Sequence, residues 1–216
     1  MNPFGPLPDP QHLFDHDEAA QAFADILDAR ASEDEIQAFL VALTARGETM
    51  VEIAAAAQAM RDRLIPIDAP EGAIDVCGTG GDGHHTLNVS TAVSIVVAAC
   101  EVPVAKHGNR AASSKAGAAD TLEALGLDME RAGRMAEATL KDLGICFLFA
   151  ANHHPAMKRI QPIRQRIGQR TIFNLMGPLA NPARVKRQLI GIARPAYVPV
   201  YAEALHYLGT EHSRII

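Results

Sequence analysis

The sequence predicts an α/β protein with a small N-terminal helical domain and a larger domain built on a parallel sheet. The N-terminal part repeats a helix-start signal in front of apolar stripes of helical spacing. From about residue 73 onward, short apolar runs alternate with helical stretches, the pattern of a parallel sheet covered by helices. We expect the helical domain at 1–68, joined by helices from about 155–180, and the α/β domain at 69–216.

Three helices are predicted before residue 65. An apolar stripe over 19–27 marks the first of them. Ser32 with Glu35, and Thr49 with Glu52, form two capping boxes, in which a hydroxyl and a carboxylate three residues later satisfy free amide groups at a helix start. This helical part carries little information about function.

The α/β part is predicted from the alternation of elements. Strands are expected at 74–77, 102–105, 145–148, 188–192 and 214–216, and helices at 91–99, 118–125, 131–143, 155–167 and 198–208. Ligands of open α/β sheets bind beyond the carboxyl ends of the strands. Functional side chains are therefore expected directly after the predicted strands.

Charge and composition limit the classes of function. The chain has 216 residues and a net charge of −5, which argues against a general nucleic-acid binder. Acidic residues dominate 9–75, whereas 152–202 contains lysines and arginines and no acidic residue. This basic segment (152–202) is either a solvated face or an anion-handling surface near the site. The longest apolar run, 92–105, is too short to span a bilayer, so we expect a cytoplasmic protein without a membrane partner.

A glycine loop (78–83) follows the first predicted strand, within the sequence DVCGTGGDG of 75–83. Glycines let the backbone turn sharply and aim amide groups at an anion, and a helix start at Ser90 and Thr91 favours negative charge as well. The two hydroxyls could cap this helix or, for Ser90, bind a hard cation such as Mg²⁺. The spacing matches neither a P-loop nor a dinucleotide-binding fingerprint.

A second polar segment, KHGNR at 106–110, is expected in the loop after the next strand. Lys106 supplies a point charge suited to phosphate, and Arg110 a planar fork. His107 could orient a substrate or accept a proton. The adjacent histidines at 84–85 and 153–154 are interpreted as solvated loop residues, since neighbouring histidines rarely bind one metal ion together.

These motifs together resemble anthranilate phosphoribosyltransferases and, more distantly, pyrimidine nucleoside phosphorylases. The resemblance covers essentially the whole chain. It rests on DVCGTGGD at 75–82, NVST at 88–91, KHGNR at 106–110 with Ser113 and Ser114, ADTLEALG at 119–126, HPAMK at 154–158 and RTIFNLMGPLANP at 170–182.

The resemblance implies a reaction and a site. The amine of anthranilate would displace pyrophosphate from C1 of 5-phosphoribosyl 1-pyrophosphate (PRPP), with Mg²⁺ as cofactor and a homodimer formed through the helical domain. Anthranilate would contact Gly78, Asn109 and Arg164, and Ser90 would bind Mg²⁺. PRPP would contact Gly78, Gly81, Asp82, Thr86, Asn88, Val89, Ser90, Thr91, Lys106, His107, Gly108, Asn109, Arg110, Ala111, Ala112, Ser113, Ser114 and Ala118.

The family pattern is incomplete in this sequence. Family members continue past Ile216 and carry an Asp-Glu pair that binds a second Mg²⁺, whereas the Asp-Glu pairs here lie at 17–18 and 34–35. We therefore expect a C-terminally incomplete chain whose 216-residue form is weakly active or inactive. The alternatives are a catalytically impaired paralogue or fragment that binds phosphorylated ligands, and a pyrimidine nucleoside phosphorylase-like enzyme.

Overall fold

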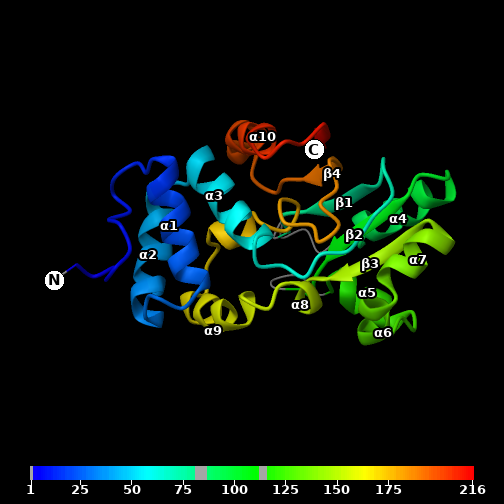
Figure 1. Ribbon diagram of the computed structural model, residues 1–216, viewed down its shortest axis with the longest axis horizontal. Helices are drawn as coiled ribbons and strands as arrows, with labels where there is room; N and C mark the ends of the chain where they lie inside the picture. The colour runs from blue at the N-terminus through cyan, green and yellow to red at the C-terminus, as the bar shows by residue number, and fades with distance from the viewer. Residues whose placement is uncertain (1, 81–86, 112–115) are drawn as a thin grey trace.

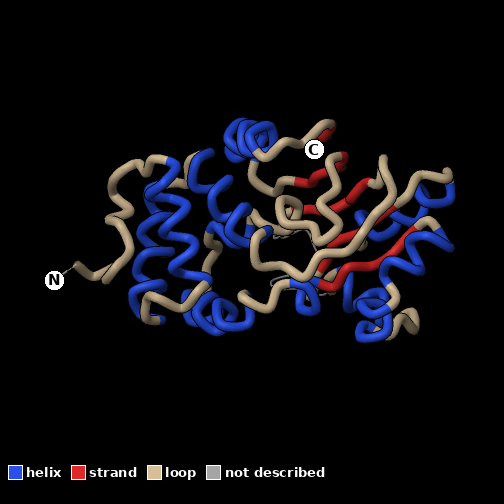
Figure 2. The backbone as a smooth tube through the Cα atoms, viewed as in Figure 1, coloured by secondary structure: helices blue, strands red, loops and turns tan. Residues whose placement is uncertain are grey.

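The computed structural model describes residues 2–80, 87–111 and 116–216. Helices from the N-terminus form one end of the molecule, and a sheet with its covering helices forms the other end (Figures 1 and 2). The predicted fold class is confirmed. Within the part of the chain that the structure describes, no helix combines the length and the apolar character needed to cross a bilayer.

The N-terminal helices are α1 (His16–Leu27), α2 (Glu33–Arg46) and α3 (Met50–Arg61). Both predicted capping boxes are present, and Asp15 forms a third with Glu18 at the start of α1. The helices bury Phe23 and Phe39, whose rings meet edge to face with centroids 6.3 Å apart. Local start signals and apolar stripes therefore suffice to build this layer.

The Thr49 cap offers a stability test in this layer. The Thr49 Oγ1 atom accepts a hydrogen bond from the Glu52 amide at 3.3 Å, and the Glu52 carboxylate accepts one from the Thr49 amide at 2.7 Å. We expect Thr49→Ala to lower the free energy of unfolding by about 1 kcal/mol, because one amide at the start of α3 loses its partner. Thr49→Ser keeps the hydroxyl and should remain near wild type in urea unfolding. Equal stability of the alanine variant and the wild type would contradict this role.

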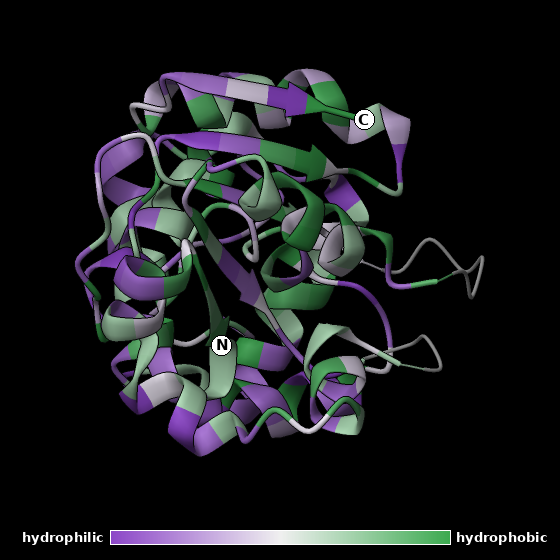
Figure 3. Cartoon of the chain, turned by 90° about the vertical axis from the view of Figure 1, so that its right-hand side faces the viewer, coloured by the Kyte–Doolittle hydropathy of each residue, from purple (hydrophilic) through white to green (hydrophobic). Residues whose placement is uncertain are grey.

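The sheet places strands in the order β3-β2-β1-β4-β5, with every neighbouring pair parallel. The strands nearest the C-terminus, β4 and β5, begin with hydrophilic residues and become hydrophobic toward their carboxyl ends (Figure 3). The strands are β1 (Ile74–Gly78), β2 (Val104–Gly108), β3 (Ile145–Phe149), β4 (Arg187–Gly191) and β5 (His212–Ile215).

The remaining helices cover the sheet or connect it to the N-terminal layer. They are α4 (Val89–Ala99), α5 (Ala118–Ala124), α6 (Met129–Arg134), α7 (Ala136–Leu143), α8 (Ala150–His153), α9 (Met157–Ile167) and α10 (Val198–Tyr207), with short 3-10 turns η1 (Ile172–Asn174) and η2 (Pro195–Tyr197).

Several predicted boundaries differ from the structure. Strand β2 starts at Val104 and continues to Gly108, since Pro103 has no amide hydrogen to donate to the sheet. The predicted helix 131–143 is interrupted at Met135, two residues after Gly133, a poor helix former. Helix α4 begins at Val89, two residues earlier than predicted. Strand β5 begins at His212 because its ladder with β4 extends back to Arg187.

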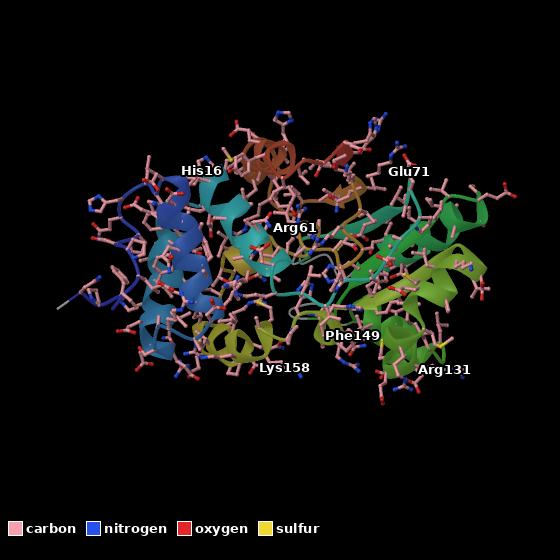
Figure 4. The ribbon with its side chains drawn as sticks, in the orientation of Figure 1. His16, Arg61, Glu71, Arg131, Phe149 and Lys158 are labelled. Atoms are coloured by element: carbon pink, nitrogen blue, oxygen red, sulfur yellow. The ribbon has the colours of Figure 1, made fainter. Side chains whose placement is uncertain are left out.

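The helical layer and the α/β part share one hydrophobic core. Helix α9 packs against α2 and buries Ile160 and Ile163. Helix α10 also packs against α3 and contributes Tyr201 to the same core, which the sequence did not indicate. Arg61, labelled between the two parts in Figure 4, donates from Nε to the Leu179 carbonyl at 2.6 Å and from Nη1 to the Leu208 carbonyl at 3.3 Å.

Candidate active site at the carboxyl edge of the sheet

Strand β1 leads directly into the glycine loop. The amide of Thr79 still donates to the Gly191 carbonyl of β4 at 2.9 Å, so the chain stays attached to the sheet beyond Gly78. A Cβ atom on Gly78 would lie 3.3 Å from that same carbonyl, and Gly80 has a φ of +65°. Close approach and positive φ thus explain two of the predicted glycines. Gly81, Asp82 and Thr86, together with the histidines at 84–85, lie outside the described residues.

Asn88, and neither Ser90 nor Thr91, occupies the N-cap position of α4. The helix therefore starts close to Ser90 and Thr91 as predicted, but the prediction that these two hydroxyl residues cap it is wrong, because they lie within its first turn after Val89. The Thr91 hydroxyl donates to Asn88 Oδ1 at 3.0 Å, and the Asn88 amide group donates to the Thr121 hydroxyl of α5 at 3.3 Å. These contacts hold the start of α4 beside the start of α5.

Lys106 is a buried residue of β2, not a loop residue as predicted. Its ammonium group donates to the Val76 carbonyl of β1 at 2.7 Å and to Ser90 Oγ of α4 at 3.3 Å. The residue is only 3% exposed. Lys106 therefore places one positive charge beneath the first turn of α4, next to Ser90, which the resemblance also assigns to PRPP.

Asp75 is a fully buried carboxyl group in the middle of the sheet. Its Oδ1 atom accepts the backbone amide of His107 at 3.0 Å. Burial raises the pKa of Asp75 to about 6, and the charge of Lys106 and hydrogen-bond donors oppose that increase. Asp75 therefore takes up a proton at a higher pH than an ordinary carboxyl group does.

The histidines that the structure describes near this edge are buried, and the interpretation of 153–154 as solvated is wrong. His107 Nδ1 lies 2.8 Å from the Gly177 carbonyl, which can only accept, so this nitrogen carries the hydrogen. His107 Nε2, which then carries no hydrogen in the neutral ring, lies 3.3 Å from His154 Nε2. Burial lowers the pKa of His107 to about 3 and that of His154 to about 4, which makes both rings neutral at pH 7. His153 Nδ1 contacts the Ile65 carbonyl at 2.9 Å.

The segment after β2 is fixed by Asp120 of α5. One carboxylate oxygen of Asp120 accepts the amides of Ala111 and Gly117, each at 2.8 Å, and the other accepts the Arg110 guanidinium at 3.1 Å. Glu123 also pairs with Arg110 at 2.7 Å. The predicted phosphate fork of Arg110 is therefore engaged by two carboxylates.

Other predicted residues of this segment occupy its backbone turns. The Asn109 carbonyl accepts the Ala119 amide at 3.2 Å, next to Ala118, the first residue of α5. Gly108 ends β2 where a Cβ atom would lie 2.8 Å from the Phe147 ring. Ala112, Ser113 and Ser114 lie outside the described residues.

The basic segment reaches the glycine loop through Arg170, whose Nη1 atom donates to the Gly80 carbonyl at 2.7 Å. Arg164 of α9 is half-buried and has no ion-pair partner among residues 2–80, 87–111 and 116–216. Burial and the charge of Arg170 lower the pKa of Arg164. Arg166, in contrast, pairs with Glu33 at the surface at 3.2 Å. The basic segment thus combines a solvated face with residues that lie near the glycine loop.

Ser90 is the described side chain at this edge that the resemblance assigns to a metal ion. The described residues contain no cluster of three or more His, Cys, Asp or Glu side chains able to hold a metal ion. Ser90 offers one hydroxyl oxygen, but the ammonium group of Lys106 lies 3.3 Å from it. One such oxygen fits a Mg²⁺ ion whose other ligands are phosphate oxygens and water, the usual mode for this ion.

The fold and this edge of the sheet define a class of protein. The family model described as the glycosyl transferase family, a/b domain, matches residues 70–216, and the helical bundle domain of the same family matches residues 11–64. The chain belongs to this glycosyl transferase family.

Similar proteins carry a more specific name. An anthranilate phosphoribosyltransferase of Sphingopyxis alaskensis is 82% identical over all 216 residues, and one of Novosphingobium aromaticivorans is 72% identical over 97% of the chain. The chain spans 65% and 64% of the lengths of these two proteins.

Solved structures agree with these relatives. The anthranilate phosphoribosyltransferase of Thermus thermophilus superposes with a TM-score of 0.87 at 42% identity, over 97% of this chain and 64% of that one. The Saccharomyces cerevisiae enzyme in complex with PRPP and Mg also has a TM-score of 0.87, at 29% identity over 99% of this chain and 64% of that one.

Proposed function

We propose that this chain carries the PRPP and anthranilate sites of an anthranilate phosphoribosyltransferase in tryptophan biosynthesis. The observation that carries this proposal is the 82% identity to a relative of that name over the whole of the chain. Because the chain spans 65% of that relative, substrates and reaction remain a proposal. A homodimer and a cytoplasmic location are proposed on the same resemblance.

In this reaction the main task of the protein would be to position two anionic substrates, anthranilate and PRPP. The amine nitrogen of anthranilate forms a bond to C1 of PRPP while the bond from C1 to pyrophosphate breaks, and the amine loses a proton. Amides of the glycine loop and the first turn of α4 favour the phosphates, with Lys106 adding a fixed positive charge below them. A bound Mg²⁺ would neutralise pyrophosphate charge, and Ser90 is the described residue placed to contribute a ligand.

Arg164 is the proposed partner of the anthranilate carboxylate. It is a half-buried guanidinium without a carboxylate partner in the described part of the chain, which favours a bidentate anion. His107 is proposed to position the Gly177 carbonyl through Nδ1, and not to accept a proton, because burial lowers its pKa to about 3 and its Nε2 atom faces the His154 ring.

The proposal is tested by measuring binding and turnover with the 216-residue chain. Anthranilate fluorescence reports turnover after PRPP and Mg²⁺ are added, and titration calorimetry reports binding of each substrate. We expect the folded chain to bind PRPP in the presence of Mg²⁺, and the full-length Sphingopyxis alaskensis enzyme serves as the positive control. A chain with a cooperative unfolding transition that binds neither substrate would overturn the proposal.

A further inference from the structure

We propose that Arg170 is a positioning residue that sets the start of the glycine loop, an inference that rests on the proposed function. Arg170 lies in the segment between α9 and η1, far from β1 in the sequence. Its Nη1 atom donates to the Gly80 carbonyl at 2.7 Å. This hydrogen bond joins the basic segment directly to the described start of the loop.

The contact acts at the point where the loop changes direction. Thr79 is still bound to β4 through its amide, whereas Gly80 has left the sheet and turned to a φ of +65°. A hydrogen bond to the Gly80 carbonyl restrains the backbone of Gly80 in this turned conformation. Backbone amides bind an anion only where the turn aims them at it, so this restraint would set the direction of the Gly80 amide at the start of the loop.

Charged and polar groups from two other parts of the chain lie near Arg170. Glu48, between α2 and α3, is buried and accepts hydrogen bonds from the Thr44 hydroxyl at 2.9 Å and from the Tyr197 hydroxyl of η2. Burial and the nearby charge of Arg194 lower the pKa of Arg170, and Tyr197 and Glu48 oppose that change. The guanidinium thus lies between the helical layer and the carboxyl edge of the sheet.

An arginine suits this position better than a lysine. The planar guanidinium presents several donors in fixed directions, so one of them can hold a carbonyl while others face other partners. Arg170 also lies on the same basic segment as Arg164, the proposed partner of anthranilate. The two substrate sites would therefore be joined by one short stretch of chain.

The test compares Arg170→Gln and Arg170→Lys with a matched control, Arg166→Gln. Arg166 belongs to the same basic segment but pairs with Glu33 and Asp34 at the surface, away from the glycine loop. Each variant is first checked for a wild-type unfolding transition. Hydrogen–deuterium exchange of the peptide containing Gly78 and Gly80 is then measured without ligand, and dissociation constants are measured for PRPP with Mg²⁺ and for anthranilate.

We expect Arg170→Gln to speed amide exchange in this peptide and to weaken PRPP binding about tenfold, the usual effect of losing a charged hydrogen bond. Anthranilate binding should weaken far less, through the loss of one positive charge near Arg164. Arg170→Lys should show slower amide exchange and tighter PRPP binding than Arg170→Gln. Arg166→Gln should match the wild type in both measurements.

Unchanged exchange in Arg170→Gln would overturn the positioning role, and so would an equal loss of binding for both substrates. If the folded wild-type chain binds no PRPP, the proposed function fails instead. The exchange measurement needs no ligand and still decides the role of Arg170 in that case.

Discussion

Arg164→Ala should raise the dissociation constant for anthranilate about 100-fold, since truncating one partner of a buried charge pair costs about 2–5 kcal/mol. The constant for PRPP should change far less. The reason is the isolation of this guanidinium: in the described part of the chain it has no carboxylate of its own, and the neighbouring charge of Arg170 makes an anionic partner favourable.

Fluorescence titration of anthranilate and calorimetric titration of PRPP measure the two constants. Arg166→Ala removes an equal charge from the same helix and should leave both constants near wild type, because Arg166 already pairs with acidic residues of α2. Equal weakening of both substrates by Arg164→Ala would show that the arginine supports the fold or the phosphate site instead of anthranilate.

Asp75→Asn should change how stability depends on pH. The pKa of Asp75 is about 6 in the folded protein against an ordinary value of 3.8. The folded state therefore binds the Asp75 proton more tightly than the unfolded state does. The protonated group contributes fully to the stability of the fold below pH 3.8, and this contribution is lost as the pH rises through about 6. The interval between the two values corresponds to about 3 kcal/mol. Asparagine keeps an oxygen acceptor for the His107 amide but cannot titrate.

We thus expect the stability of Asp75→Asn, relative to wild type, to increase by about 3 kcal/mol between about pH 3 and about pH 7. Urea unfolding at several pH values measures this difference. The low pKa values of His107 and His154 destabilise both proteins as pH falls, so their effect largely cancels. A difference that stays constant with pH would show that Asp75 does not titrate in this range.

Local signals in the sequence predicted the framework well. The boxes at Ser32 and Thr49 appear as predicted because a cap involves residues only three positions apart. The five strands were found from their apolar runs. The apolar run ends at Ala105, which predicts a loop at Lys106 and His107, whereas strand β2 continues through both residues. A buried lysine and histidine need partners that local periodicity does not reveal.

Those partners explain why the site was only partly predictable. Lys106 is satisfied by Val76 and Ser90, and His107 by Gly177 and His154, all from other elements. The raised pKa of Asp75 also results from its burial, and the spacing of residues in the sequence does not indicate that burial. Family resemblance supplied most of the candidate residues, but it gave no account of Arg170 or of the contact between Glu48 and Tyr197.

The packing of α10 against α3 has a consequence for dividing this protein. The two family matches meet between residues 64 and 70, which suggests a place to separate the chain. A polypeptide beginning at residue 70 would expose the face of Tyr201, Ala204 and Leu205 that α3 and its neighbours now cover. The boundary between the two family matches therefore separates two stretches of sequence but cuts through one hydrophobic core. Chimaeras between relatives should exchange α9, η1 and α10 together with the first three helices.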